Sequence, residues 1–178
     1  VLAITGLGVK ITSIILSLSD GSLWLALLLT AFACLVLGME VPTTAAYVIC
    51  ISVAGPALSE LGLPLLLSHL FVFWFALLST ITPPVCGGVF IAAGMVDENW
   101  LKVAIRAMTL GIGLYIIPLA MVANPGVIGF AEAPFVALLD ALKIALGLAG
   151  ISYGVIAKRT ALMRLLLVVA GAGLIFAI

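Results

Sequence analysis

The stretch Gly38-Met39-Glu40-Val41-Pro42-Thr43-Thr44 breaks a run of apolar residues in its middle. A second break, Ser79-Thr80-Ile81-Thr82-Pro83-Pro84 followed by Gly87-Gly88, interrupts the next long apolar run in the same way. In hydrocarbon every backbone N–H and C=O needs a partner, so a broken helix persists only where protein or a water-filled cavity covers it. Two such breaks close together in a sequence are typical of a substrate and ion site within a membrane.

The composition supports a membrane environment. The chain has 178 residues, of which 66% are hydrophobic and 8% are charged, and its mean hydropathy is +1.48. A soluble domain carries about 25% charged residues, so we predict an all-α polytopic membrane protein. The net charge is zero, which leaves no electrostatic basis for binding nucleic acid. Cys34, Cys50 and Cys86 lack metal-ligand spacing and are interpreted as small buried hydrophobic residues.

The apolar runs predict six membrane segments. These are a partial helix over 1–19, a re-entrant helical hairpin over 20–62 with its tip at 38–44, a discontinuous helix over 63–96 with its break at 79–84, and helices over 103–123, 135–157 and 162–178, the last one truncated. The two hairpin arms, 23–37 and 45–59, would each be ~22 Å long as helices, which is short for a full crossing. Two complete crossings remain the alternative.

Basic residues predict the orientation of these helices. The loop over 124–132 contains no Lys or Arg and is therefore placed outside the cell. Five basic residues mark the cytoplasmic ends: Lys102, Arg106, Lys158, Arg159 and Arg164. A hairpin and a double crossing over 20–62 both return the chain to the side of the membrane from which it started, so they fit this orientation equally well.

The two breaks supply the candidate binding residues. Half-helix C-termini and unwound carbonyls offer oxygen ligands to a cation, and half-helix N-termini offer N–H groups to an anion. The candidate ion and substrate residues are Gly38, Glu40, Pro42, Thr43, Thr44, Ser79, Thr82, Pro83 and Pro84. The hydroxyls of Thr43, Ser79 and Thr82 are the candidate sodium ligands. Alternatively, each hydroxyl bonds the carbonyl one turn before it in its own helix.

The remaining polar residues of the apolar runs receive weaker assignments. Glu40 is the only carboxylate expected at mid-membrane depth, where acids mark functional sites, although a solvated tip would also hold it. His69 is interpreted as an interfacial or packed residue. Asp140 and Lys143 are three residues apart and are expected to pair on one helix face.

The first break, read as Leu37-Gly38-Met39-Glu40-Val41-Pro42-Thr43-Thr44-Ala45-Ala46-Tyr47, resembles a Gly-Met-Gly-x-Pro-Thr-Thr-Ala-Ala-Tyr signature. That signature belongs to the large membrane subunit of TRAP (tripartite ATP-independent periplasmic) transporters, and the resemblance is to its TAXI branch, often fused to the small membrane subunit. Glu40 stands where that family usually has Gly. Further matching stretches are Pro56-Ala57-Leu58, His69-Leu70-Phe71-Val72-Phe73, Ile81-Thr82-Pro83-Pro84-Val85, Asn124-Pro125 and Arg164-Leu165-Leu166-Leu167.

The resemblance implies half of an inverted-repeat, elevator-type transporter, with one re-entrant hairpin and one discontinuous helix. It implies sodium-coupled import of an organic acid, a carboxylate, through the cytoplasmic (inner) membrane of a bacterium or archaeon. An extracytoplasmic solute-binding protein, the small membrane subunit and the N-terminal half of the permease are the implied partners. Sodium is the coupling ion, and no other cofactor is implied. Because the sequence lacks an initiator Met, we expect a C-terminal portion that does not transport alone.

Three alternatives remain. The chain would be a non-transporting helical scaffold if both breaks were simple kinks. Another class of inverted-repeat ion or anion symporter would use the same kind of breaks. An intramembrane enzyme is disfavoured, because the sequence has one His, no His/Cys metal pattern and no paired acids in a span. Sodium-dependent binding would separate a transporter from a scaffold.

Overall fold

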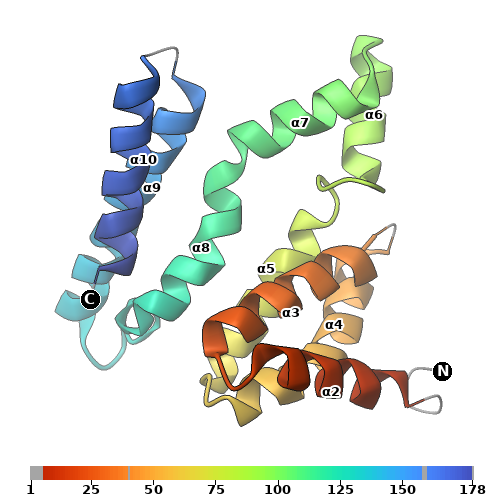
Figure 1. Ribbon diagram of the computed structural model, residues 1–178, viewed down its shortest axis with the longest axis vertical. Coiled ribbons are helices and arrows are strands. Elements are labelled where there is room, and N and C mark those ends of the chain that lie inside the picture. Colours follow the sequence, from red (N-terminus) through yellow and green to blue (C-terminus); the bar gives the residue numbers. More distant parts are fainter. Residues whose placement is uncertain (1–5, 40, 158–159, 178) are drawn as a thin grey trace. The chain divides into compact units, whose positions relative to one another are not determined.

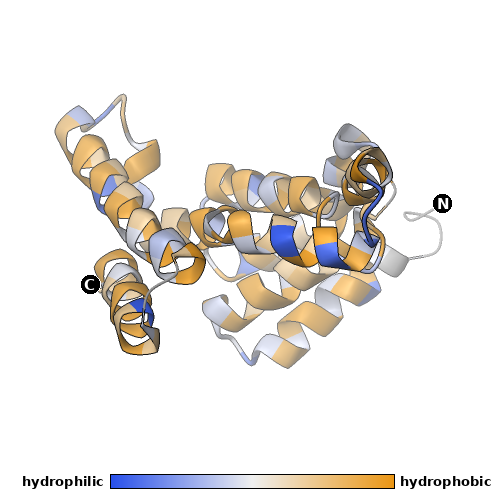
Figure 2. Ribbon diagram, turned by 90° about the horizontal axis from the view of Figure 1, so that it is seen from above, coloured by the Kyte–Doolittle hydropathy of each residue, from blue (hydrophilic) through white to orange (hydrophobic). Residues whose placement is uncertain are grey.

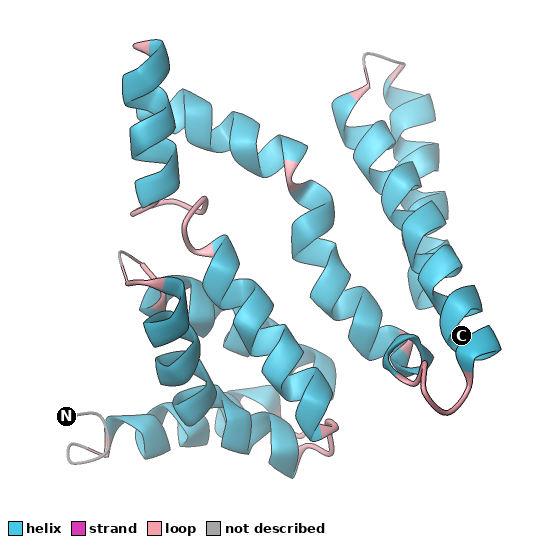
Figure 3. Cartoon of the chain, turned by 180° about the vertical axis from the view of Figure 1, so that it is seen from behind, coloured by secondary structure: helices cyan, strands magenta, loops and turns pink. Residues whose placement is uncertain are grey.

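A computed structural model describes residues 6–39, 41–157 and 160–177 (Figure 1). All regular structure in these ranges is helical, as Figure 3 shows, which confirms the predicted all-α class. The chain divides into two compact units, residues 1–104 and 105–178.

The first unit contains the helices around both breaks. Helix α2 covers Leu7–Ser19, α3 covers Leu23–Leu37, α4 covers Thr43–Glu60, α5 covers Leu65–Leu78 and α6 covers Gly87–Val96. Helix α4 packs against α2, α3 and α5, and α3 also packs against α2 and α5. Helices α3 and α4 therefore both lie against α5, the helix that precedes the second break.

Small and apolar side chains let these helices pack closely. Cys34 and Cys50 are fully buried between α3 and α4, and Cys86 is buried before α6; all three are free thiols, as the interpretation from sequence requires. The Thr12 hydroxyl donates to the Val53 carbonyl at 2.5 Å and so joins α2 to α4. The largest fully buried side chains of this unit are Leu27, Val53, Leu58, Leu67, Phe71 and Val72.

The segment predicted as one helix over 103–123 is two helices. Helix α7 covers Trp100–Leu110, α8 covers Ile112–Ala123, and their axes differ by 42°. Gly111 lies between them in a non-helical conformation, as expected for the residue that tolerates a helix break most readily. The predicted helix over 103–123 is therefore interrupted at Gly111, although α7 and α8 together could still cross as one bent span.

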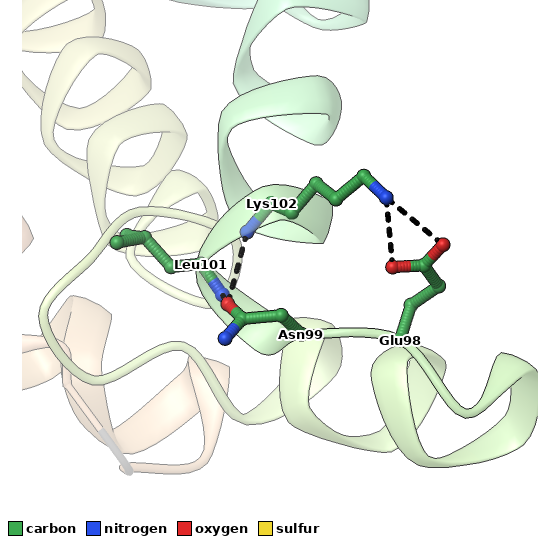
Figure 4. Close-up of polar contacts among 4 residues, drawn as sticks. All are labelled: Glu98, Asn99, Leu101 and Lys102. Atoms are coloured by element: carbon green, nitrogen blue, oxygen red, sulfur yellow. Dashed lines mark hydrogen bonds and ion pairs between the residues drawn. The ribbon is translucent and has the colours of Figure 1, made fainter.

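Helix α7 begins earlier than predicted because the residues before it cap it. The Asn99 side chain accepts hydrogen bonds from the Leu101 N–H at 2.9 Å and the Lys102 N–H at 3.4 Å (Figure 4). Lys102 also forms an exposed ion pair with Glu98 at 2.9 Å, one turn away. An Asn at this position satisfies N–H groups that a helix start leaves without partners, so α7 begins at Trp100 and residues 100–102 belong to its first turn.

The second unit is built on an antiparallel pair, α9 over Pro134–Ile156 and α10 over Ala161–Phe176, which run side by side in Figure 1. Helix α8 and the short 3₁₀ helix η1, Pro125–Ile128, pack against α9. The core of the unit consists of Ala120, Ile144, Ile151 and Ile175. Helices α9 and α10 approach closely at Gly171, where a Cβ atom would lie 2.5 Å from the Gly147 carbonyl oxygen. Small residues at such a crossing are typical of membrane helix pairs.

Lys143 does not pair with Asp140. Its ammonium donates to the Asn124 side-chain oxygen at 2.8 Å and to the Ala177 carbonyl at 3.1 Å. The Asn124 amide nitrogen in turn donates to the carbonyls of Ala120 and Ile175, both at 3.0 Å. The predicted pair was wrong because a buried amide and a free helix-end carbonyl compete for the ammonium. The network joins the ends of α8 and α10 to α9.

Lys143→Met should therefore destabilise this unit. The substitution leaves the buried Asn124 oxygen and the Ala177 carbonyl without this donor, which costs about 1–3 kcal/mol in the free energy of unfolding. Asp140→Asn is the matched control and should cost under about 1 kcal/mol, as a surface substitution does. Chemical unfolding in detergent measures both. Equal losses in the two variants would favour the Asp140–Lys143 pair after all.

Most residues of the helices are hydrophobic (Figure 2), and large hydrophobic side chains such as Phe32, Leu65 and Ile91 are exposed. Within the described residues, α9 with 23 residues could cross a bilayer by itself, and α7 and α8 could cross as one bent span. The helices beside the breaks are shorter: α4 has 18 residues, and the other three are α3 with 15, α5 with 14 and α6 with 10. At ~1.5 Å per residue, none of these three reaches across the ~30 Å hydrocarbon layer.

Candidate functional site

The two sequence breaks are in direct contact. The Ser79 hydroxyl, at the end of α5, donates to the Gly38 carbonyl oxygen at the end of α3 over 3.0 Å. Both residues are buried. The C-terminal ends of α3 and α5 accordingly lie together in Figure 1. This contact brings residues that are 41 positions apart in the sequence to one point.

Gly38 is required at this contact because nothing larger fits. A Cβ atom at position 38 would lie 2.6 Å from the Ser79 hydroxyl oxygen and 3.0 Å from the Cys34 carbonyl oxygen. The backbone of Gly38 is itself helical, with φ −83° and ψ −5°. The glycine therefore serves the close approach of two helix ends and not an unusual backbone angle.

Helix α4 begins immediately after the first break. Pro42 is its N-cap residue and provides no side-chain cap, and the first intrahelical bond runs from the Ala46 N–H to the Pro42 carbonyl at 2.9 Å. The N–H groups of Thr43, Thr44 and Ala45 have no acceptor among the described residues. Three N–H donors and the positive end of an 18-residue helix are therefore available at the hairpin tip.

At the end of α5, hydroxyl groups bond the last carbonyls of the helix. Thr82 donates to the Leu78 carbonyl at 2.7 Å and Thr80 donates to the Leu77 carbonyl at 2.9 Å. Ser79 donates to the Ala76 carbonyl at 2.7 Å as well as to Gly38. The alternative in which these hydroxyls bond their own helix is thus realised for Ser79 and Thr82. A hydroxyl that donates its proton still carries two lone pairs, so this bonding leaves its oxygen able to bind a cation.

The second half of the discontinuous helix begins later than predicted. The break was expected at 79–84 with the next helix starting near Pro84, but residues 79–86 are non-helical and α6 starts at Gly87. The Cys86 carbonyl accepts the first N–H bonds of α6, from Val89 and Phe90. Pro83 is half-buried, Pro84 is exposed, and the peptide bond between them is cis.

The predicted site residues therefore fall into three groups. Gly38 and Ser79 are in contact, and Thr82, Pro83 and Pro84 follow Ser79 in the same break. Pro42, Thr43 and Thr44 form the start of α4; Thr43 is half-buried and Thr44 is exposed. Glu40 lies outside the described residues.

One half-buried polar pair at the α4–α5 contact was not predicted. The Tyr47 hydroxyl lies 2.5 Å from His69 Nδ1, and the Tyr47 ring packs edge-on against Phe73. Sequence analysis treated His69 alone as a packed residue and gave Tyr47 no role. The available signal was that both are polar aromatic residues inside apolar helices, where a buried polar tip requires a partner.

A cation site made of the described residues of the breaks would consist of neutral oxygen atoms, since Glu40 is not among them. Among the described residues, no group of three or more His, Cys, Asp or Glu side chains could hold a metal ion. Hydroxyl and main-chain carbonyl oxygens remain, and hard cations prefer oxygen ligands. The arrangement offers these oxygens at the ends of α3 and α5 and N–H donors at the start of α4.

Comparison with known proteins gives one family match. Residues 1–136 match the family described as the tripartite ATP-independent periplasmic transporter, DctM component. The match includes both breaks and all of α2 to α8. No curated protein and no solved structure shows a significant match to the chain.

Proposed function

The chain belongs to the DctM component family of tripartite ATP-independent periplasmic transporters, and from this premise we propose that it is a permease component of a sodium-coupled importer of an organic acid. A solute-binding protein outside the membrane and a small membrane subunit are the partners that the family implies. Fusion to that small subunit, as in the TAXI branch, is part of the same proposal. Membership of a transporter family also makes an enzymatic role implausible.

The contact between Ser79 and Gly38 is the observation that supports this proposal most strongly. Two unrelated kinks would not need to meet, whereas a site made of broken helices requires their ends to converge. Here the hydroxyl of one break bonds the main chain of the other at 3.0 Å in a buried position. The ends of α3 and α5 both carry the negative end of a helix dipole, which favours a cation between them.

Sodium is the cation that this chemistry suits. The oxygen atoms of Ser79 and Thr82 and main-chain carbonyls of the two breaks are neutral ligands, and a monovalent ion needs no carboxylate among them. Thr43, at the start of α4, is the third proposed hydroxyl ligand. The bonds that Ser79 and Thr82 donate to helix carbonyls fix their side chains and so hold their oxygens in place.

The start of α4 suits the carboxylate of an organic acid. The N–H groups of Thr43 and Thr44 are free of acceptors among the described residues, and they lie at the positive end of α4. A helix start with free N–H groups is a general binding site for anions. Sodium and substrate would then occupy adjacent parts of one site, which would couple their binding.

The transport geometry is a further part of the proposal. Helices α3 and α4 would form a re-entrant hairpin, and α5 and α6 a discontinuous helix, in one repeat of an inverted-repeat, elevator-type permease of the inner membrane. The shortness of α3, α5 and α6 supports this arrangement over full crossings. The other repeat would supply the remaining half of the site.

Thr82→Val tests the ligand set. Valine has the size of threonine but no oxygen, so we expect the sodium concentration for half-maximal uptake to rise about tenfold, which corresponds to ~1.4 kcal/mol. Uptake by the assembled transporter with its binding protein, measured against sodium concentration, gives this value.

Thr80→Val is the matched control, because Thr80 makes the same kind of bond to its helix but is exposed. Its sodium dependence should stay within about twofold of wild type, as expected for a surface substitution. An unchanged sodium dependence in Thr82→Val would remove Thr82 from the ligand set. Uptake that needs no sodium in the wild type would favour another class of symporter, and no uptake in the complete assembly would favour a scaffold.

A further inference from the structure

Arg164 of α10 bonds the end of α9. Its Nε donates to the Gly154 carbonyl at 3.0 Å and its Nη2 donates to the Val155 carbonyl at 2.9 Å. These carbonyls belong to the last turn of α9, where a helix leaves carbonyls without partners inside it. A guanidinium has five N–H donors, so these two bonds leave three for another acceptor.

The first turn of α10 adds donors next to this guanidinium. Thr160 is the N-cap residue and its side chain caps no N–H, while its carbonyl accepts the Arg164 N–H at 3.1 Å. The N–H groups of residues 161–163 have no acceptor among the described residues. An anion at this point would meet free N–H groups, the positive end of the α10 dipole and a fixed arginine.

A surface hollow of about 280 Å³ lies beside these donors. It is lined by Gly154, Val155, Ala161, Arg164, Leu165 and Val168. The surface of α10 that continues from it exposes Leu162, Leu166 and Val169, each at least 60% accessible. The site therefore combines polar donors at one end with apolar walls and an apolar helix surface, which fits an amphiphilic ligand better than a water-soluble anion.

The charge of this region selects an anionic ligand. The sequence from residue 144 to 178 contains three basic residues and no acidic residue. Two of them, Lys158 and Arg159, lie outside the described residues and are not part of the site. The same basic residues predict that this end of the hairpin is cytoplasmic, where the membrane surface carries anionic lipids.

We propose that the cytoplasmic end of the α9–α10 pair binds the phosphate group of an anionic phospholipid. Arg164 and the first-turn N–H groups of α10 bind the phosphate, and the acyl chains lie along the exposed leucines and valine of α10. If Arg164 served only to cap α9, its two carbonyl bonds would be sufficient and the protein would show no preference among lipids.

Native mass spectrometry of the purified protein in detergent tests this site. Phosphatidylglycerol should be retained about tenfold more strongly than phosphatidylcholine with the same acyl chains. Arg164→Gln keeps an N–H donor for a carbonyl of α9 but removes the charge, and it should weaken phosphatidylglycerol retention about tenfold, as expected for a lost charge-assisted bond. Arg106→Gln removes an exposed basic residue elsewhere and is the control, with less than about a twofold effect.

A second variant separates lipid binding from helix capping. Ala161→Leu keeps Arg164 and its two carbonyl bonds but fills the hollow, so it should weaken phosphatidylglycerol retention to a similar extent while the thermal unfolding midpoint stays near that of wild type. Equal retention of the two lipids, or equal losses in Arg164→Gln and Arg106→Gln, would overturn the proposal. Displacement of phosphatidylglycerol by equimolar inorganic phosphate would overturn it too, because the site would then bind a soluble anion.

Discussion

Gly38→Ala should reduce sodium-driven uptake about tenfold to a hundredfold. The added Cβ atom would lie 2.6 Å from the Ser79 hydroxyl oxygen and 3.0 Å from the Cys34 carbonyl oxygen, so the ends of α3 and α5 must move apart. Overpacking of this kind costs about 1–3 kcal/mol, and the cost falls on the contact that holds the two breaks together. Uptake by the assembled transporter at saturating sodium, normalised to the amount of protein in the membrane, measures the loss.

Two further variants isolate the cause. Gly94→Ala places the same methyl group in α6, where no atom lies within 4 Å of the new Cβ, and should leave uptake within about twofold of wild type. The double variant Gly38→Ala with Ser79→Gly removes the clash with the Ser79 side chain, but it also removes the Ser79 hydroxyl. Its thermal stability should therefore recover, while its sodium dependence should not. Wild-type uptake in Gly38→Ala would show that the close approach of the breaks is dispensable.

Ser79→Ala should raise the sodium concentration for half-maximal uptake about tenfold. The substitution removes the buried hydroxyl that bonds the Gly38 carbonyl, which among the described residues then keeps the hydrogen bond from the Val41 N–H at 3.4 Å. Loss of a buried partner costs about 1–3 kcal/mol, and a sodium ligand is lost with it. Sodium titrations of uptake should therefore shift at least as much in Ser79→Ala as in Thr82→Val, whose hydroxyl bonds the last residue of α5 and not the other break.

Ser68→Ala is the matched control for Ser79→Ala. Ser68 is equally buried in α5 and also donates to a carbonyl of its own chain, Pro64 at 3.3 Å, but it lies far from the break in the helix. Its sodium dependence should match that of wild type. Equal shifts in the two serine variants would point to a general loosening of α5 and would contradict a specific role for Ser79.

The sequence predicted best the helices whose ends coincide with residues that favour a helix start or end, such as Ser, Gly and Pro. The bounds of α3 follow from Ser22, which caps its first turn, and from Gly38 at its end, and the structure places α3 at the predicted 23–37. Pro42 likewise explains the start of α4, since proline favours the beginning of a helix and disfavours its interior. Apolar length alone was less informative: nothing but Gly111 marks the bend between α7 and α8, and a single glycine within an apolar run often continues a membrane helix.

The candidate site was predicted as a set of residues but not as a contact. Gly38 and Ser79 were both identified from their breaks, yet the bond between them depends on the packing of α3 against α5, which no local pattern encodes. Lys143 shows the same limit, because a nearby Asp140 is visible in the sequence and a distant Asn124 is not. Local rules identify which groups need partners, and tertiary packing decides which partners they obtain.

Sodium-specific stabilisation of the purified protein tests the proposed site most directly. A ligand that binds only the folded state stabilises it by RT ln(1 + [L]/Kd), which is about 2.7 kcal/mol at a hundred times Kd. With ionic strength held constant by potassium, we expect sodium to raise the thermal unfolding midpoint of the wild type to a plateau. In Ser79→Ala the sodium concentration that gives half of this rise should be about tenfold higher. Identical effects of sodium and potassium, or a full sodium effect in Ser79→Ala, would contradict a sodium site between the two breaks.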